Sequence, residues 1–142
     1  MSEEDISHLL NALENDSNSS IMNLTSGKIK DQKNNILQKI QLPRVKLKEF
    51  HKKLKKYRYC SELKDIQFGF YIRWIPLKTF ENLKLTNGAL ICEIKSINKE
   101  IHIVCKNNMN RMMQIKFDEV LIFQKLSDQE QVILGILDYL ED

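Results

Sequence analysis

The stretch NGALICEIKSINKEIHIVCKNN, residues 87–108, decides the fold of this 142-residue chain. It opens with Asn87-Gly88, a dipeptide typical of tight turns. Two runs of β-forming residues follow, and Asn98-Lys99 separates them. The residues expected to face inward are Leu90, Cys92 and Ile94 in the first run and Ile101, Ile103 and Cys105 in the second. This alternation predicts a β-hairpin that is buried on one side.

Further β-forming segments on both sides extend the hairpin into a sheet. The aromatic run FGFYIRWI, residues 68–75, precedes it, and runs at 113–117 and 120–123 follow it. Five short strands without a helix long enough for a crossover predict an antiparallel meander or small barrel over residues 63–126. The predicted class is mainly β with flanking helices (α+β). The nearest architecture is a five-stranded SH3-like or Tudor-like barrel, with an OB-like barrel as the alternative, and neither assigns a function.

A basic helical segment, residues 31–62, precedes the predicted core. Its last helix is expected to begin near Arg44, because Leu42-Pro43 disfavours continuing an earlier helix. An apolar stripe is formed by Leu47, Phe50, Leu54 and Tyr57. The rest of the helix surface carries Lys46, Lys48, Lys52, Lys53, Lys55, Lys56 and Arg58. These cations favour contact with nucleic-acid phosphates. The alternative is a docked helix whose charged back is only solvated.

Charge is segregated along the chain. The net charge is −5 over residues 1–27, +9 over 28–66, +4 over 67–125 and −5 over 126–142, which gives +3 in total. Lys outnumbers Arg 18 to 4, and this usage, with 17 Ile and 12 Asn, is typical of an AT-rich genome. Lysine-based charge is weaker evidence for nucleic-acid binding than arginine-based charge. Codon usage does not explain the segregation, so the basic middle remains a candidate binding surface.

The two ends of the chain are acidic and amphipathic. Residues 1–30 are expected to be a largely disordered tail with one short helix, whose apolar stripe is Ile6, Leu9, Leu10 and Leu13. This stripe either frays in solvent or folds into a groove on a protein partner. Residues 127–142 begin with the capping box Ser127-Asp128-Gln129-Glu130 and continue as a helix. We expect that helix to pack on or near the barrel, with docking onto another protein as the alternative.

The aromatic strand offers two faces. Phe68, Phe70, Ile72 and Trp74 are expected on the core side, and Tyr71 and Arg73 on the other. Tyr71 and Arg73 are candidates for stacking on a base and contacting a phosphate, or for simple cross-strand pairing.

Catalytic and metal-binding patterns are missing. His8, His51 and His102 are scattered, and the three cysteines form no CxxC pair. No phosphate-binding glycine motif occurs among the four glycines. The sequence therefore predicts neither an enzyme nor a cofactor, metal or small-molecule site. An odd number of cysteines and the lack of a signal peptide or long apolar run indicate an intracellular, reducing compartment, with a virion as an alternative.

Residues 53–74, KLKKYRYCSELKDIQFGFYIRW, resemble uncharacterised small proteins of large double-stranded DNA viruses. The resemblance covers roughly a sixth of the chain. It implies a virion, transcription or genome-handling accessory protein, without a defined activity.

These observations predict a non-catalytic accessory module that binds nucleic-acid phosphate through its basic helix within a larger assembly. The alternative is a protein–protein adaptor or structural subunit that uses the barrel and the acidic terminal helices.

Overall fold

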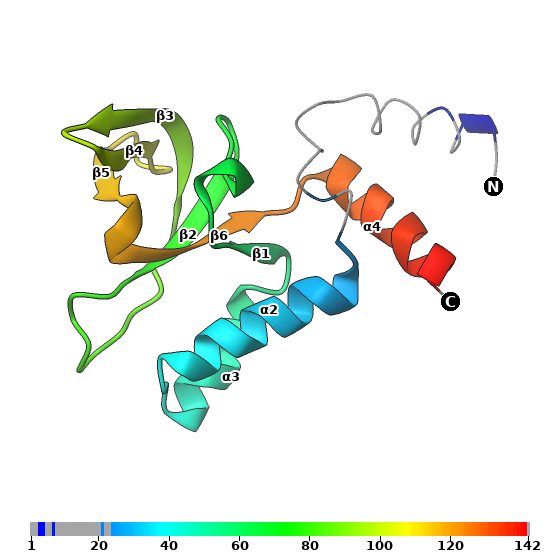
Figure 1. Cartoon of the computed structure of the whole chain (residues 1–142), viewed down its shortest axis with the longest axis horizontal. Helices are drawn as coiled ribbons and strands as arrows, with labels where there is room; N and C mark the ends of the chain where they lie inside the picture. Colours follow the sequence, from blue (N-terminus) through cyan, green and yellow to red (C-terminus); the bar gives the residue numbers. More distant parts are fainter. Residues whose placement is uncertain (1–2, 5–6, 8–20, 22–23, 142) are drawn as a thin grey trace.

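The chain forms an α+β fold with a single six-stranded antiparallel sheet, seen here in a computed structural model that describes residues 3–4, 7, 21 and 24–141 (Figure 1). Two helices come first, α2 (Ser26–Lys39) and α3 (Arg44–Lys53). The strands are β1 (Tyr57–Cys60), β2 (Tyr71–Pro76), β3 (Ala89–Ile97), β4 (Glu100–Lys106), β5 (Met112–Lys116) and β6 (Val120–Lys125). Two short 3-10 helices, η2 (Leu63–Asp65) and η3 (Phe117–Glu119), interrupt the strands, and α4 (Asp128–Glu141) ends the chain.

The sheet is strongly curved but open. Its strand order is β1-β6-β2-β3-β4-β5, so β5 and β6 are four strand spacings apart, about 19 Å in a flat sheet. The three residues of η3 join these strands, and the link from Lys116 to Val120 spans at most about 14 Å. The sheet must therefore curl to bring the ends of β5 and β6 together. Each edge strand nevertheless pairs on one side only among the described residues, β5 with β4 and β1 with β6.

The prediction of a closed five-stranded barrel, whether SH3-like, Tudor-like or OB-like, is therefore wrong. The strand that the prediction missed is β1, because Tyr57 continued the apolar stripe of the basic helix. In the structure α3 ends at Lys53, and the Nζ atom of Lys33 donates hydrogen bonds to the carbonyl oxygens of Leu54 (2.9 Å) and Lys55 (3.4 Å). This cation satisfies carbonyls that the helix leaves unpaired, and the chain then turns into β1.

Three apolar clusters hold the fold together. The concave side of the sheet buries Cys60, Ile66, Ile72, Trp74, Ala89, Ile91, Ile103, Cys105 and Ile122. The opposite side packs against α2 and α3 through Leu37, Phe50, Leu54, Tyr57, Ile75, Leu83, Leu121 and Phe123. The third cluster joins α4 to the start of α2 through Ile21, Ile29, Ile133 and Leu134. The sheet is thus covered by helices on one side only.

The predicted turn at Asn98-Lys99 is present, whereas Asn87-Gly88 lies in the irregular connection before β3 and not in a turn. Asn98 and Lys99 have positive φ angles of 51° and 67° and close a two-residue hairpin between β3 and β4. The Oδ1 atom of Asn107 accepts hydrogen bonds from the backbone N–H groups of Met109 and Arg111, both at 2.9 Å, in the turn between β4 and β5. Three facing predictions are wrong. Leu90 and Cys92 are exposed and Ile91 is buried instead, with a shift of the pairing register at a bulge between Ile91 and Glu93. Phe68 is 61% exposed because it lies in a turn before β2 and not in the strand.

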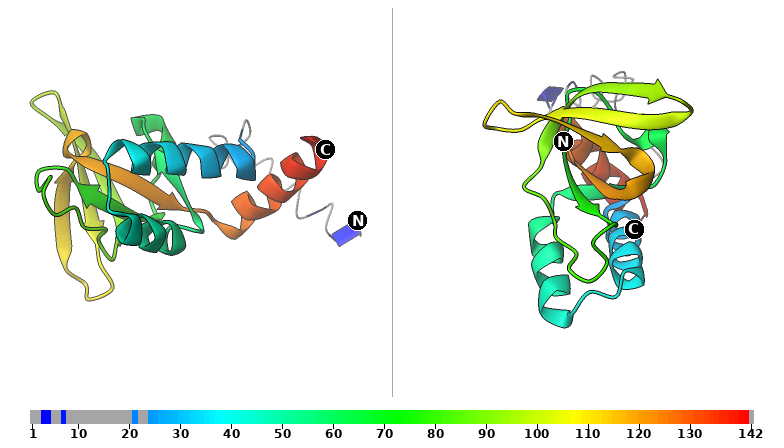
Figure 2. Two further views of the ribbon diagram at one scale, coloured as in Figure 1. Left: turned by 90° about the horizontal axis from the view of Figure 1, so that it is seen from below. Right: turned by 90° about the vertical axis from the view of Figure 1, so that its left-hand side faces the viewer.

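The last helix continues from β6 and projects beyond the sheet, next to the start of α2 (Figure 2). The predicted capping box is present, since the Ser127 N–H donates to Glu130 Oε1 (2.9 Å) and the Glu130 N–H donates to Ser127 Oγ (3.1 Å). Asp138 accepts hydrogen bonds from the backbone N–H (2.8 Å) and the hydroxyl (2.6 Å) of Ser26, so this acid neutralises the N-terminal end of α2. Within the described residues, none of the helices has both the length and the apolar content that a membrane span requires.

Candidate nucleic-acid interface

The predicted basic residues separate into two groups, those held by contacts within the fold and those left exposed. Lys46 belongs to the first group: its Nζ atom donates to Asn82 Oδ1 (2.8 Å) and to the carbonyl oxygen of Leu83 (3.1 Å). This contact fixes the long connection between β2 and β3 onto α3. Lys53 forms an ion pair with Glu49 one turn earlier, at 2.6 Å. Both ammonium groups therefore already have partners.

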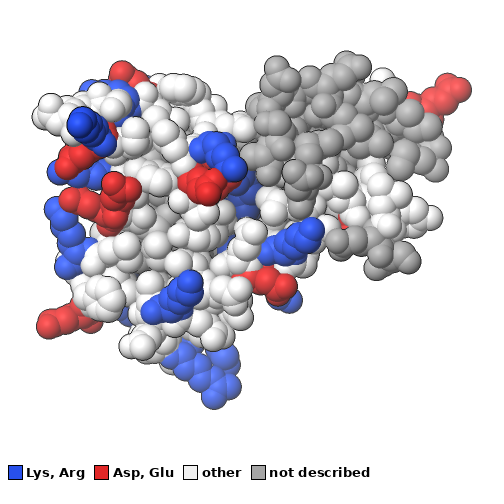
Figure 3. Space-filling view, in the orientation of Figure 1, with Lys and Arg blue, Asp and Glu red and all other residues white. Residues whose placement is uncertain are grey.

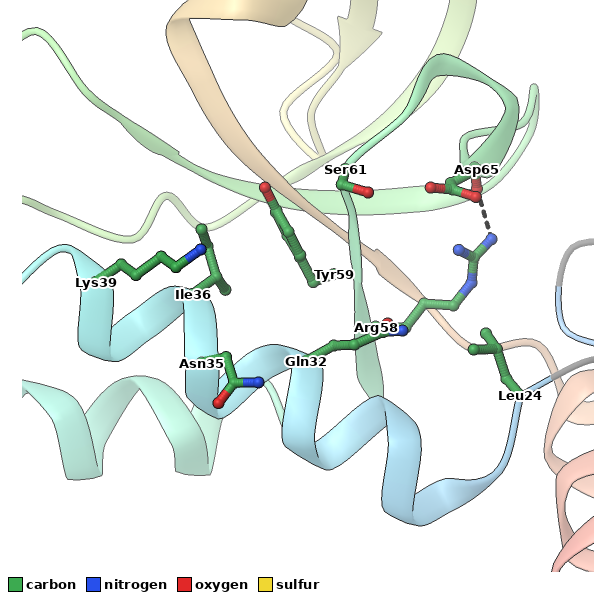
Figure 4. Close-up of a pocket in the computed structure, with 9 residues that line it drawn as sticks. All are labelled: Leu24, Gln32, Asn35, Ile36, Lys39, Arg58, Tyr59, Ser61 and Asp65. Atoms are coloured by element: carbon green, nitrogen blue, oxygen red, sulfur yellow. Dashed lines mark hydrogen bonds between the residues drawn. The ribbon is translucent and has the colours of Figure 1, made fainter.

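Arg58 is buried, with an exposed fraction of only 2%. Its guanidinium donates to the carbonyl oxygen of Asp65 and to the sulfur of Cys60 (3.4 Å), and its Nε atom lies 4.0 Å from Glu130 Oε2 (Figure 4). Glu130 is itself fully buried, and burial raises the pKa of its carboxyl group. Arg58 thus connects β1 to η2 and to the start of α4, and it is not part of the exposed binding surface.

Tyr71 and Arg73 contact the chain segment that follows in sequence. The Tyr71 hydroxyl donates to the carbonyl oxygen of Asn87 (3.2 Å), and Arg73 Nε donates to that of Thr86 (2.8 Å). Both side chains are half-buried. Their contacts fasten the connection between β2 and β3, so neither residue is presented as a free stacking or phosphate-binding group.

Five of the predicted lysines are exposed; Lys53 is paired with Glu49, and the other four are Lys48, Lys52, Lys55 and Lys56. In the described part of the chain no hydrogen bond or ion pair to their ammonium groups is present. Lys56 lines a shallow cleft together with Lys125 of β6. Lys48 and Lys52 lie one turn apart on α3, and Lys55 and Lys56 follow in the turn into β1; we name these four lysines the basic edge.

The structure adds basic residues from α2 that the sequence did not connect with this edge. A cleft of about 600 Å³ lies between α2, the end of α3 and α4. We name it the basic cleft; its lining includes Lys30, Lys33, Asn34, His51 and Lys55, with Asp31 as the one acid, and Ile29, Leu126 and Leu134 supply its apolar part. Lys30 and Lys55 are 25 positions apart in the sequence, and only the packing of α2 on α3 brings them together.

The lining of the basic cleft lowers the pKa of two of its own groups. Burial, followed by the charges of Lys33 and Lys30, lowers the pKa of His51 below its usual 6.5. Burial and the neighbouring Lys30 also lower the pKa of the Lys33 ammonium group. Burial is the larger cause in both groups, and the contribution of the neighbouring lysines shows that their positive charges lie close together.

A second cleft lies on the other side of α2, between that helix and β1 (Figure 4). Its volume is about 310 Å³, and the polar uncharged residues of its lining are Gln32, Asn35, Tyr59 and Ser61. Lys39 is the cation at its helical end, while Arg58 points away from it toward Asp65. This cleft carries less positive charge than the basic cleft and is not a strong candidate for binding anions.

The sheet does not extend the basic edge into a large basic face. On the described part of the side seen in Figure 3, basic and acidic side chains are interspersed over the strands. Ion pairs such as Lys78–Glu119 (3.2 Å) and Lys116–Glu100 (3.3 Å) account for part of this pattern. On this face the strands therefore carry no continuous basic surface.

The remaining chemistry of the described residues is structural. No group of three or more His, Cys, Asp or Glu side chains is placed to hold a metal ion there. Cys60 and Cys105 are buried, and burial raises the pKa of each thiol to about 12, which keeps them protonated. His102 contacts Gln114 at 2.9 Å on the neighbouring strand. The predicted partner-binding residues Ile6, Leu9, Leu10 and Leu13 lie outside the described residues.

Comparison with known proteins adds no family. No family model, curated protein or solved structure matches this chain.

Proposed function

We propose that this protein is a non-catalytic module that binds nucleic-acid phosphates through the basic edge formed by Lys48, Lys52, Lys55 and Lys56, extended by Lys30 across the basic cleft. The observation that carries the proposal is the basic cleft, where the exposed Lys30 of α2 and the exposed Lys55 of the turn after α3 lie beside the buried Lys33. Such a site gains free energy when phosphates neutralise it and release counterions.

The cations that border the basic cleft are lysines, which supports backbone contact rather than base recognition. Lysine is a flexible point charge, whereas arginine has the planar geometry that reads guanine. Arg58 and Arg73 both have partners inside the fold. The proposed binding is therefore independent of sequence and steeply dependent on salt.

Fluorescence anisotropy with labelled DNA and RNA tests this proposal. The variant Lys52→Glu/Lys55→Glu/Lys56→Glu is expected to weaken binding at least tenfold at 50 mM salt. Wild-type affinity should fall with salt, with a slope of roughly −2 to −3 in log–log form for three phosphate contacts. The matched control is Lys84→Glu/Lys99→Glu/Lys106→Glu, which makes the same change in net charge at exposed positions elsewhere. Equal losses in the two variants would contradict a localised interface.

A second candidate function is that of a protein adaptor, and the exposed apolar side chains of α4 favour it. Val132, Tyr139 and Leu140 are 44%, 80% and 72% exposed. Affinity purification from the native source after nuclease treatment separates the two functions. An adaptor retains a defined partner after nuclease and loses it in the variant Val132→Lys/Tyr139→Lys. If nuclease removes every partner, the adaptor function is excluded.

A further inference from the structure

The basic cleft has a shape that simple phosphate contact does not require. A duplex presents its phosphates on a convex surface, and lysines on the exposed edge of α3 are sufficient to reach them. The basic cleft instead encloses about 600 Å³, which is within the range of pockets that hold small molecules. Its lysines therefore border a hollow that a duplex backbone would leave empty.

The lining of the hollow is divided into apolar and cationic parts. Ile29, Leu126 and Leu134 supply the apolar part, while Lys30 and Lys55 are exposed cations from the two facing elements. A ligand that fits both parts carries a negative charge next to a flat or apolar body. A nucleotide that has left its stack has this composition, because its base is largely apolar on its faces and its phosphate is charged.

His51 and Asn34 add groups that suit a base. The pKa of His51 is lowered, so the imidazole is mainly neutral at pH 7 and offers a planar surface for stacking. Asn34 lines the same cleft and carries an amide that can donate to the edge of a base. Its Oδ1 atom already accepts from Gln38 Nε2 at 3.3 Å, which orients the amide group.

We propose that the basic cleft receives one unstacked nucleotide, with its base between His51 and the apolar lining and its phosphate between Lys30 and Lys55. The protein is then a binder of single-stranded nucleic acid or of unpaired ends. This inference rests on the proposed function and narrows its ligand from nucleic acid in general to single strands.

The direction of the strand preference distinguishes this inference from phosphate contact alone. A duplex has the higher charge density, so lysine contact without base insertion favours the duplex. Base insertion requires an unpaired base and so favours the single strand. Anisotropy with labelled oligothymidine of about 12 nucleotides and a duplex of the same length is therefore decisive. We expect the single strand to bind at least tenfold more tightly at 50 mM salt.

Variants of His51 test whether the base of the bound nucleotide stacks on this side chain. His51→Ala is expected to weaken single-strand binding at least about fivefold, the lower limit for one stacked base, and to leave duplex binding unchanged. His51→Phe restores the planar surface and is expected to restore the single-strand affinity. His8→Ala is the matched control for the loss of a histidine. Urea unfolding of each variant shows that the fold is retained.

The outcomes separate the two proposals. Equal binding of both probes, or tighter binding of the duplex, overturns the inference, as does single-strand affinity that is unchanged in His51→Ala. The proposed function survives these results as long as the lysine-to-glutamate variant still weakens binding. If neither probe binds at 50 mM salt, the proposed function fails, and with it the inference. Displacement of the oligothymidine by an acidic amphipathic peptide, without any effect of His51→Ala, would reassign the cleft to a protein partner.

Discussion

The concave side of the sheet and the junction where β1, β6 and α4 meet are both buried, but they are built from different groups. The concave side holds aliphatic side chains, Trp74 and two thiols. The junction holds Arg58, Gln124 and Glu130 at 2%, 0% and 0% exposure. The first gains stability from apolar area alone, which has no direction. The second depends on directed hydrogen bonds and on a charge pair.

This difference determines which region sets the geometry of the candidate site. Apolar packing tolerates substitution by residues of similar volume. The junction fixes the start of α4, because Glu130 both closes the capping box and faces Arg58 on β1. The placement of α4 in turn sets the positions of Leu126 and Leu134, which line the basic cleft. The polar junction therefore positions the cleft, whereas the apolar core mainly supplies stability.

Truncation of the apolar core is expected to have the largest effect. Trp74 is 4% exposed, and Trp74→Ala should lower the free energy of unfolding by about 3–5 kcal/mol. Urea unfolding followed by circular dichroism measures this change without the tryptophan signal. Phe80, which is 69% exposed, provides the matched aromatic control: Phe80→Ala should change stability by less than about 0.5 kcal/mol. Similar losses in both variants would mean that the concave side is not the main core.

Breaking the charge pair between Arg58 and Glu130 should have the second-largest effect on stability. Glu130→Leu removes the cap and leaves the Arg58 charge buried, so we expect a loss of about 3 kcal/mol. Replacing both residues, as in Arg58→Met/Glu130→Leu, should recover a large part of this loss, because no uncompensated charge remains. A double variant as unstable as the sum of the single variants would show that the two side chains are not coupled.

The same contrast explains how much of the fold the sequence predicts. Patterns within a few neighbouring residues were sufficient to predict the Asn98-Lys99 hairpin and the Ser127–Glu130 capping box. β1 was missed because Tyr57 extends a helical stripe, although Tyr57-Arg58-Tyr59-Cys60 is rich in residues that favour strands. The helix ends where Lys33 binds the carbonyl of Leu54, a contact across 21 residues that no local pattern reveals.

Only part of the candidate site could be predicted from the sequence, for the same reason. The lysines of α3 and the following turn formed an obvious cluster, but Lys30 and His51 meet only in the folded chain. Arg58 was assigned to the surface because arginine is almost never fully buried unless it is paired. Sequence alone thus identified the charge of the site but not its cleft.

Capping of α2 offers a smaller test of the region that borders the cleft. Thr25 Oγ1 accepts a hydrogen bond from the Lys28 N–H at 3.2 Å. Thr25→Ala removes this cap and should cost about 1 kcal/mol of stability. Thr25→Ser keeps the hydroxyl and should cost clearly less, which separates the cap from the methyl group. Urea unfolding measures both variants, and equal losses would argue that packing rather than capping is lost.

The smallest effect should be a pH dependence that originates in the basic cleft. Burial, followed by the charges of Lys33 and Lys30 of α2, lowers the pKa of His51. Lys55 is the further cation of the lining, Asp31 is its one acid, and α4 contributes the apolar Leu134. Below pH 6.5 the unfolded chain therefore protonates this histidine more readily than the folded chain does. Stability should fall as the pH decreases through this range.

The substitution His51→Gln isolates this contribution. Other titrating groups act equally in both proteins, so the difference between their urea midpoints at pH 7.5 and pH 5.5 belongs to His51. We expect the midpoint of the wild type to fall more than that of the variant. Single-stranded nucleic acid should oppose the fall, because a phosphate between Lys30 and Lys55 reduces the repulsion that lowers the pKa of His51. A duplex that reaches only the outer edge of α3 should oppose it less. The same histidine thus reports whether an anion enters the cleft or remains outside it.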